Sequence, residues 1–124
     1  AIERAQKAPA KYIVEGGSTR SDKAPAYHLN PGFGYRRASQ RFGLGAEIHG
    51  EGNWTSSIHA GEKECRAFCR EAFNHMIEHA RKMNLGEEPD DDHLGAIGWA
   101  VCVLAYTEEY WRQPWTSLDR EALT

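Results

Sequence analysis

Apolar side chains recur at intervals of three and four residues over residues 62–84, which is the spacing of an amphipathic helix. The apolar positions are Cys65, Phe68, Cys69, Ala72, Phe73, Met76, Ile77, Ala80 and Met83. Leu85 and Gly86 follow, and glycine is common just past the last turn of a helix. The pattern therefore predicts one long amphipathic helix that ends at this pair.

The next segment is apolar on almost every side, not along a single stripe. Pro89 suits the first turn of a helix, and the run from Asp90 to Asp92 suits its positive N-terminal end. From Leu94 to Tyr106 almost every side chain is apolar. Such a helix must be covered on most sides, and a hairpin with one short helix cannot cover it. Self-association as a homodimer or homotetramer, with this helix at the centre, is therefore expected.

Glycine and proline interrupt the chain before this hairpin. The breaks are Pro9, Gly16, Gly17, Pro25, Pro31 and Gly32. Because such a run cannot sustain a long helix, residues 1–35 are expected to form an extended arm, and residues 36–124 a single helical domain. Within that domain a short helix should start at Arg36 and stop at Gly43 and Gly45, before a glycine-rich loop that ends at Trp54.

Composition excludes several classes of protein. The 124 residues carry 15 Lys and Arg against 18 Asp and Glu, and the resulting net charge of −3 argues against stable nucleic-acid or anionic-membrane binding. No apolar run is long enough to span a bilayer. The three cysteines, without a secretory signal, suggest reduced thiols packed in the core of a cytoplasmic protein.

Acidic and histidine side chains gather at one end of the predicted hairpin. At about 100° per residue, Glu71, His75 and Glu78 share one narrow stripe beside the apolar face. A short loop would bring the start of the next helix close to this stripe. The candidate metal ligands are His75, Glu78, Asp90, Asp92 and His93. Because oxygen ligands dominate, Mg²⁺ or Mn²⁺ is the expected cofactor.

Ordinary alternatives apply to each part of this group. The run from Asp90 to Asp92 could simply cap a helix and complement its dipole, and His75 alone could be a hydrogen-bonded residue beside the core. Acids and histidines on both helices, at the same end, favour a metal. A zinc site made of the two Cys and two His of the first helix is excluded, because Cys65 and His79 lie about 21 Å apart along its axis.

Four short blocks occur in a fixed order along the chain. They are Gly16–Pro25 (GGSTRSDKAP), Tyr27–Pro31 (YHLNP), Phe42–Trp54 (FGLGAEIHGEGNW) and the segment from Arg70 to Ala100. Together they resemble the phage dATP/dGTP diphosphohydrolase family, a branch of the MazG-like all-α nucleoside triphosphate pyrophosphohydrolases, over about residues 12–109. The wider superfamily binds Mg²⁺ with Glu-Glu-x-x-Glu on one helix and Glu-x-x-Asp on the next. Here NHMIE (residues 74–78) and DDDH (residues 90–93) stand in those places, so histidine replaces an acid twice.

The resemblance implies an all-α, MazG-like helical bundle completed by oligomerisation, with an extended N-terminal arm. It implies hydrolysis of a dNTP, dATP or dGTP, to dNMP and pyrophosphate, in the host cytoplasm if a phage encodes the chain. Glu71 and Glu78 would be catalytic. The substrate-binding candidates are Arg20, Lys23 and Arg70 for phosphates, and Asn53 and Trp54 for the base. Alternatively, Arg20 and Lys23 lie in a solvated loop, and Trp54 anchors its loop in the core.

Two other functions stay open at this point. The histidines in place of acids also fit a non-catalytic nucleotide-binding or assembly module on the same scaffold. A third possibility is a phosphohydrolase that acts on phosphomonoesters with His75, His93 and the Asp run. The products formed from a dNTP would distinguish the three functions. Release of pyrophosphate indicates the pyrophosphohydrolase, binding without turnover indicates the non-catalytic module, and release of orthophosphate indicates the phosphohydrolase.

Overall fold

The structure is a computed structural model that describes residues 12–13, 19–20 and 26–120, with side chains from residue 26 onward. The chain divides into two units, Ala1–Pro31 and Gly32–Thr124. In the first unit, β1 (Tyr12–Ile13) pairs antiparallel with β2 (Thr19–Arg20), and a single 3-10 turn, η1, follows at Tyr27–Leu29.

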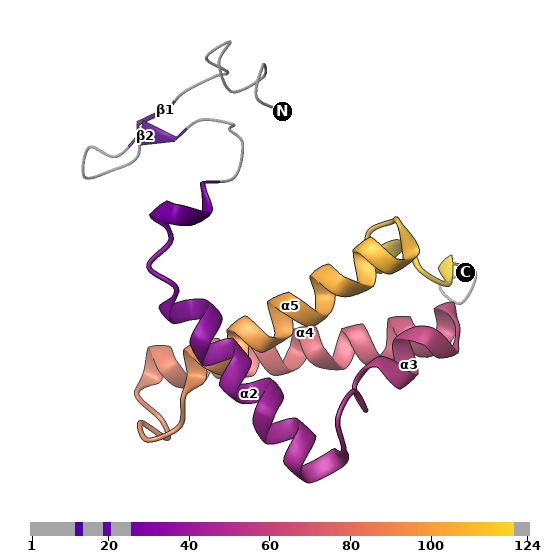
Figure 1. Ribbon diagram of the computed structural model, residues 1–124, viewed down its shortest axis with the longest axis horizontal. Coiled ribbons are helices and arrows are strands. Elements are labelled where there is room, and N and C mark those ends of the chain that lie inside the picture. Colours follow the sequence, from indigo (N-terminus) through magenta and orange to yellow (C-terminus); the bar gives the residue numbers. More distant parts are fainter. Residues whose placement is uncertain (1–11, 14–18, 21–25, 121–124) are drawn as a thin grey trace. The chain divides into compact units, whose positions relative to one another are not determined.

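The second unit is all-α, as expected from the sequence (Figure 1). Its elements are α2 (Phe33–His49), α3 (Thr55–Ala60), α4 (Glu62–Leu85), α5 (His93–Trp111) and the 3-10 turn η2 (Trp115–Ser117). α5 packs against both α4 and α2, while α3 packs against α4. Of the helices in residues 26–120, none has the length and apolar character needed to cross a membrane.

The predicted amphipathic helix is confirmed as α4, and it ends at Leu85 as expected. Gly86 takes a left-handed conformation, with φ 71°, that side chains rarely adopt. Its N–H donates to the carbonyl of Met83, and the N–H of Glu87 donates to the carbonyl of Lys82 at 2.9 Å. These two bonds satisfy the last carbonyls of α4 and turn the chain back toward α5.

The second helix begins later than its sequence suggests. Pro89, Asp90 and Asp91 lie in the connection, and α5 starts at His93. Asp92 is the N-cap, because its carboxylate accepts a hydrogen bond from the N–H of Gly95 at 3.1 Å. Only the last acid of the run therefore caps the helix, and the prediction that Pro89 occupies its first turn was wrong.

The prediction of a short helix that stops at Gly43 and Gly45 was also wrong. α2 runs from Phe33 to His49, so it starts within the expected arm and continues through both glycines. An interior glycine costs a helix only about 1 kcal/mol relative to alanine, which packing against another helix can offset. The partner is α5, where a side chain at Gly98 would come within 3.1 Å of Ala38.

The core lies between α3, α4, α5 and the segment after α5. Its fully or almost fully buried members are Ile58, Cys65, Cys69, Ala72, Val103 and Leu118. Arg66 of α4 donates to the carbonyls of Thr116 and Leu118 at 2.6 and 2.7 Å, which holds the last segment over the core. The segment after α5 thus covers part of the core, although its sequence gives no sign of this role.

α5 nevertheless keeps part of its apolar surface exposed. Leu94 is 49% exposed and Val101 is 52% exposed. Cys102 is exposed too, so the expectation that all three cysteines pack in the core holds only for Cys65 and Cys69. Self-association through α5 stays a prediction.

Candidate metal centre and adjoining cavities

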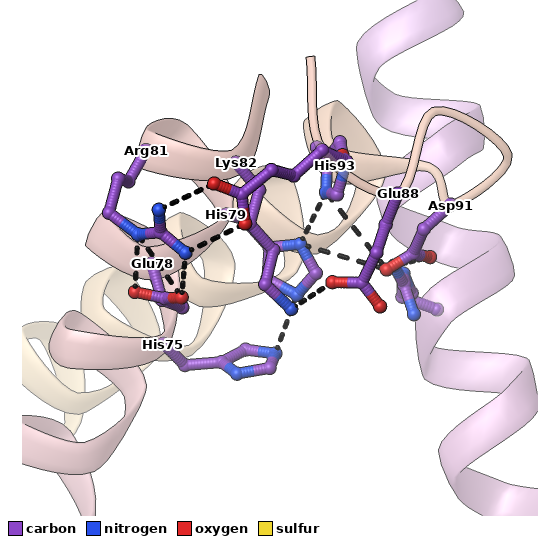
Figure 2. A network of polar contacts seen from close by, with 10 residues as sticks. His75, Glu78, His79, Arg81, Lys82, Glu88, Asp91 and His93 are labelled. Carbon is purple, nitrogen blue, oxygen red and sulfur yellow. Dashed lines mark hydrogen bonds and ion pairs between the residues drawn. The ribbon is translucent and has the colours of Figure 1, made fainter. Parts of the chain in front are cut away.

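His79, Asp91 and His93 form the group best suited to hold a metal ion in the described part of the chain. His79 lies on α4, His93 is the first residue of α5, and Asp91 lies on the connection between them. The Nδ1 atoms of the two histidines are 2.9 Å apart, and Oδ2 of Asp91 is 3.8 and 4.0 Å from them. Figure 2 shows His79 in the middle of this network.

The spacing and chemistry of these three residues fit a divalent ion. Bonds of about 2.0–2.2 Å to one ion place neighbouring ligand atoms roughly 3–4 Å apart. Nε2–H of His93 donates to the carbonyl of Glu87 at 2.9 Å, which leaves the Nδ1 lone pair of His93 toward the group. Burial, and then the charge of His75, lowers the pKa of His79, so this imidazole is kept in the neutral form that binds metals.

His75 extends the network along α4. Its Nε2 lies 3.2 Å from Nε2 of His79, one helical turn further along. Because Nδ1 of His93 accepts from Nδ1–H of His79, Nε2 of His79 accepts from Nε2–H of His75; an ion bound at Nδ1 of His79 would reverse the bond to His75. His75 therefore orients a candidate ligand and does not itself belong to the set of three.

Two arginines of α2 neutralise the acids of the connection. Arg41 contacts Asp91 at 2.6 Å and also donates to the carbonyl of Asp92. Partial burial raises the pKa of Asp91, but Arg41 and the nearby histidines outweigh that effect and leave the pKa below its ordinary value. Arg37 contacts both carboxylate oxygens of Asp92, and this hydrogen bonding lowers the pKa of Asp92. Both acids are thus held ionised.

A cavity of about 430 Å³ lies between α2, α4 and α5; it is lined by Arg41 and His75, which contact the candidate metal centre, but not by His79, Asp91 or His93 themselves. Four of its lining side chains are polar, namely Arg41, His49, Glu71 and His75. Half-buried Phe68 and Trp99 contribute apolar wall. We call it the polar cavity, because it combines a cation, two imidazoles and one carboxylate.

A second cavity, of about 360 Å³, lies between α2, the loop before α3 and α5. Its rings come from Phe42, Trp54 and Trp99, with Phe42 5.3 Å from Trp54 and 6.1 Å from Trp99 between ring centres. Asn53 and Glu51 add polar groups to its wall. We call it the aromatic cavity.

The structure brings together some of the sequence-predicted site residues. His93 lies in the candidate metal centre, His75 contacts His79 of that group, and Glu71 lines the polar cavity with His75. Asn53 and Trp54, the predicted base-binding residues, line the aromatic cavity.

Other predicted site residues lie elsewhere. Glu78 pairs with Arg81 on the exposed side of α4, as Figure 2 shows, and this contact lowers the pKa of Glu78. Asp92 is engaged by Arg37 and by its role as N-cap, which is the ordinary alternative for an acid at a helix start. Asp90 is exposed and is not in the group of three.

The predicted phosphate-binding residues are placed least well. Arg70 is exposed and does not line either cavity. Arg20 belongs to β2, of which only the backbone is described, and Lys23 lies outside the described residues.

Sequence reasoning missed His79 and Asp91 as candidate ligands, and Arg41 as the neighbour of Asp91. His79 follows His75 by four residues, a spacing that places two side chains on one face of a helix and could have identified it. Nothing local distinguishes Asp91 from the acids on either side. Arg41 lies 50 residues from Asp91 along the chain, so only the fold reveals their contact.

No protein-family model, curated protein or solved structure matches this chain. The resemblance to the phage diphosphohydrolases therefore stays an expectation.

Proposed function

We propose that the protein is a metal-dependent nucleoside triphosphate pyrophosphohydrolase that converts a dNTP to dNMP and pyrophosphate. The observation that carries the proposal is a double link between the metal centre and the polar cavity. Arg41 lines the cavity and contacts Asp91, while His75 lines it and contacts His79. A triphosphate held in the polar cavity would thus lie next to the ion. The preference for dATP or dGTP follows from the resemblance alone.

The side chains of the polar cavity can be assigned roles. Arg41 is the group best suited to phosphate oxygens, because guanidinium donates several parallel hydrogen bonds. His49 and His75 can donate further hydrogen bonds. A bound divalent ion would neutralise negative charge on the phosphate oxygens.

Glu71 is the proposed general base. Its carboxylate takes a proton from water as the water oxygen bonds to the α-phosphorus. The bond from that phosphorus to the bridging oxygen breaks, and pyrophosphate leaves with the electron pair. Since Glu78 is paired with Arg81 away from the polar cavity, Glu71 alone is retained in the reaction.

The ligand set bears on the choice of ion. Two imidazoles and one carboxylate suit a first-row transition ion better than Mg²⁺, which prefers oxygen ligands. Mn²⁺ is therefore the better of the two predicted ions, and Zn²⁺ is a further candidate.

The test is to incubate the purified protein with each dNTP and Mg²⁺, Mn²⁺ or Zn²⁺ and to resolve the products. Pyrophosphate with dNMP is the expected result, and orthophosphate would point instead to a phosphomonoesterase. Glu71→Gln should abolish turnover. Glu78→Gln is the matched control on the same helix and should leave turnover unchanged; the reverse pattern would refute the role given to Glu71.

One observation favours a second candidate, a non-catalytic nucleotide-binding module. His79 and His93 are only 5% and 6% exposed and the Asp91 side chain is 38% exposed, so an ion among them would be covered on the histidine side, as ions are in structural sites. The ion would then hold the connection between α4 and α5 in place. Nucleotide binding without turnover under every metal condition would support this candidate over the hydrolase.

A further inference from the structure

The polar and aromatic cavities share one wall. Gly45 and His49 of α2 and Trp99 of α5 line both of them. Beyond these shared residues, the polar cavity carries Arg41 and Glu71 as well as the ring of Phe68, and the aromatic cavity carries the rings of Phe42 and Trp54 as well as Glu51. The two cavities thus adjoin; both have mainly apolar walls, and only the polar cavity includes an arginine that could bind phosphate.

Gly45 is the member of the shared wall that the protein's own packing does not explain. It lies inside α2, where glycine is less favourable than alanine because of its backbone entropy. A Cβ added at Gly45 would meet no described atom within 4 Å. By contrast, a Cβ at Gly98 would meet the Cβ of Ala38 at 3.1 Å, so close helix packing accounts for that glycine.

We propose that Gly45 is the point at which a bound nucleotide passes from the polar cavity into the aromatic cavity. The triphosphate lies by Arg41, the base lies among the rings beside Trp54, and the sugar lies against the backbone of α2. Glycine is required there because a side chain would occupy the space of the sugar. Gly45 is thus a positioning residue that makes the site accept a whole nucleotide in preference to a bare polyphosphate.

This inference rests on the proposed function, in that it places the same substrate across both cavities. It makes a separable claim, however, because binding of a nucleotide across Gly45 does not require that the nucleotide be hydrolysed. The α,β-methylene analogue of dGTP, which cannot release pyrophosphate, is therefore the appropriate probe. Inorganic tripolyphosphate is the comparison ligand, because it can fill only the polar cavity.

The experiment measures the Kd of both probes, by calorimetry with Mn²⁺, for the wild type, Gly45→Ala and Gly34→Ala. Gly34 is the matched control, because it also lies on α2 with no described atom within 4 Å of an added Cβ and lines neither cavity. Gly45→Ala should weaken binding of the analogue about tenfold or more, the usual effect of overfilling a packed site. Gly34→Ala should leave it unchanged, and neither change should lower the denaturation midpoint.

Tripolyphosphate should bind Gly45→Ala with nearly wild-type affinity. The inference is overturned if Gly45→Ala binds the analogue as well as Gly34→Ala does, if both probes weaken equally, or if the wild type does not bind the analogue. Turnover of dGTP is measured in parallel. If Gly45→Ala binds the analogue more weakly but the wild type does not hydrolyse dGTP, the inference about Gly45 is supported and the hydrolase is refuted. If the wild type hydrolyses dGTP but Gly45→Ala binds the analogue as the wild type does, the hydrolase is supported and the inference about Gly45 is refuted.

Discussion

Asp92 gives the sharpest test of how the connection between α4 and α5 is held. Its carboxylate accepts a hydrogen bond from the N–H of Gly95 at 3.1 Å, and Nε of Arg37 lies 3.0 and 3.1 Å from its two oxygens. Asp92→Ala removes both contacts. Asp92→Asn keeps an oxygen able to cap the helix but removes the charge that pairs with Arg37.

The expected loss follows from these two contacts. Replacing an N-cap acid by alanine costs about 1 kcal/mol of the free energy of unfolding, within a range of about 0.5–2 kcal/mol. The side chains of Arg37 and Asp92 are 39% and 34% exposed, so solvent screens their ion pair and its contribution is the smaller of the two. Asp92→Asn should therefore destabilise the protein less than Asp92→Ala.

Urea denaturation followed by helical circular dichroism measures both losses. Asp90→Ala is the matched control, because Asp90 is an exposed neighbour whose removal should change stability by less than about 0.5 kcal/mol. If Asp92→Ala and Asp90→Ala have equal stability, the capping role is refuted. Equal losses for Asp92→Ala and Asp92→Asn would instead show that the cap contributes nothing beyond the charge.

The stability that Asp92 contributes should also depend on pH. Hydrogen bonding from Arg37 lowers the pKa of Asp92 below its ordinary value of 3.8. The stability that this carboxylate adds is therefore fully present above the pKa of the unfolded chain and is lost as pH falls through the lower pKa of the folded protein. The difference in stability between the wild type and Asp92→Asn should narrow below about pH 4. A difference that is constant down to pH 2 would contradict the assignment.

Three further outcomes are expected. Leu118→Ala should reduce the free energy of unfolding by about 2–5 kcal/mol in urea titrations, because this side chain is fully buried; a loss within error would contradict its place in the core. In the native protein a thiol reagent at pH 8 should label Cys102 alone, because burial raises the pKa of the Cys65 thiol and raises that of Cys69 to about 11. Fast labelling of more than one thiol would contradict the burial of these two cysteines. Mn²⁺ or Zn²⁺, at a free concentration of 100 times its Kd, should stabilise the wild type by about 2.7 kcal/mol and so raise its melting temperature, but should leave His79→Ala unchanged. Equal shifts in the two proteins would place the ion elsewhere.

Local patterns predicted the hairpin well. The apolar spacing of α4 and the glycine at its end depend on interactions between residues a few positions apart, so they are readable in a short window of sequence. The start of α5 was misjudged because several acids in a row can each act as an N-cap. Only the backbone of the folded connection decides that Asp92 has this role and that Asp91 turns toward His79.

α2 was misjudged for a different reason. Local propensity places a stop at Gly43 and Gly45, but the close crossing of α2 over α5 at Ala38 and Gly98 adds packing energy that a short window does not contain. The same crossing delivers Arg37 and Arg41 to the acids of the connection. Two of the charges that define the site therefore come from a helix that the sequence predicted only in part.

By itself, the sequence determined an all-α fold, the length and end of α4, and the gathering of histidines and acids at one end of a hairpin. These features depend on helical periodicity and on short connections, which are local. The tertiary structure decided that His79, Asp91 and His93 form the group, that Glu78 faces Arg81, and that two cavities meet at Gly45. Such contacts depend on which side of each helix meets its neighbours, and that is settled by packing between segments far apart in the chain.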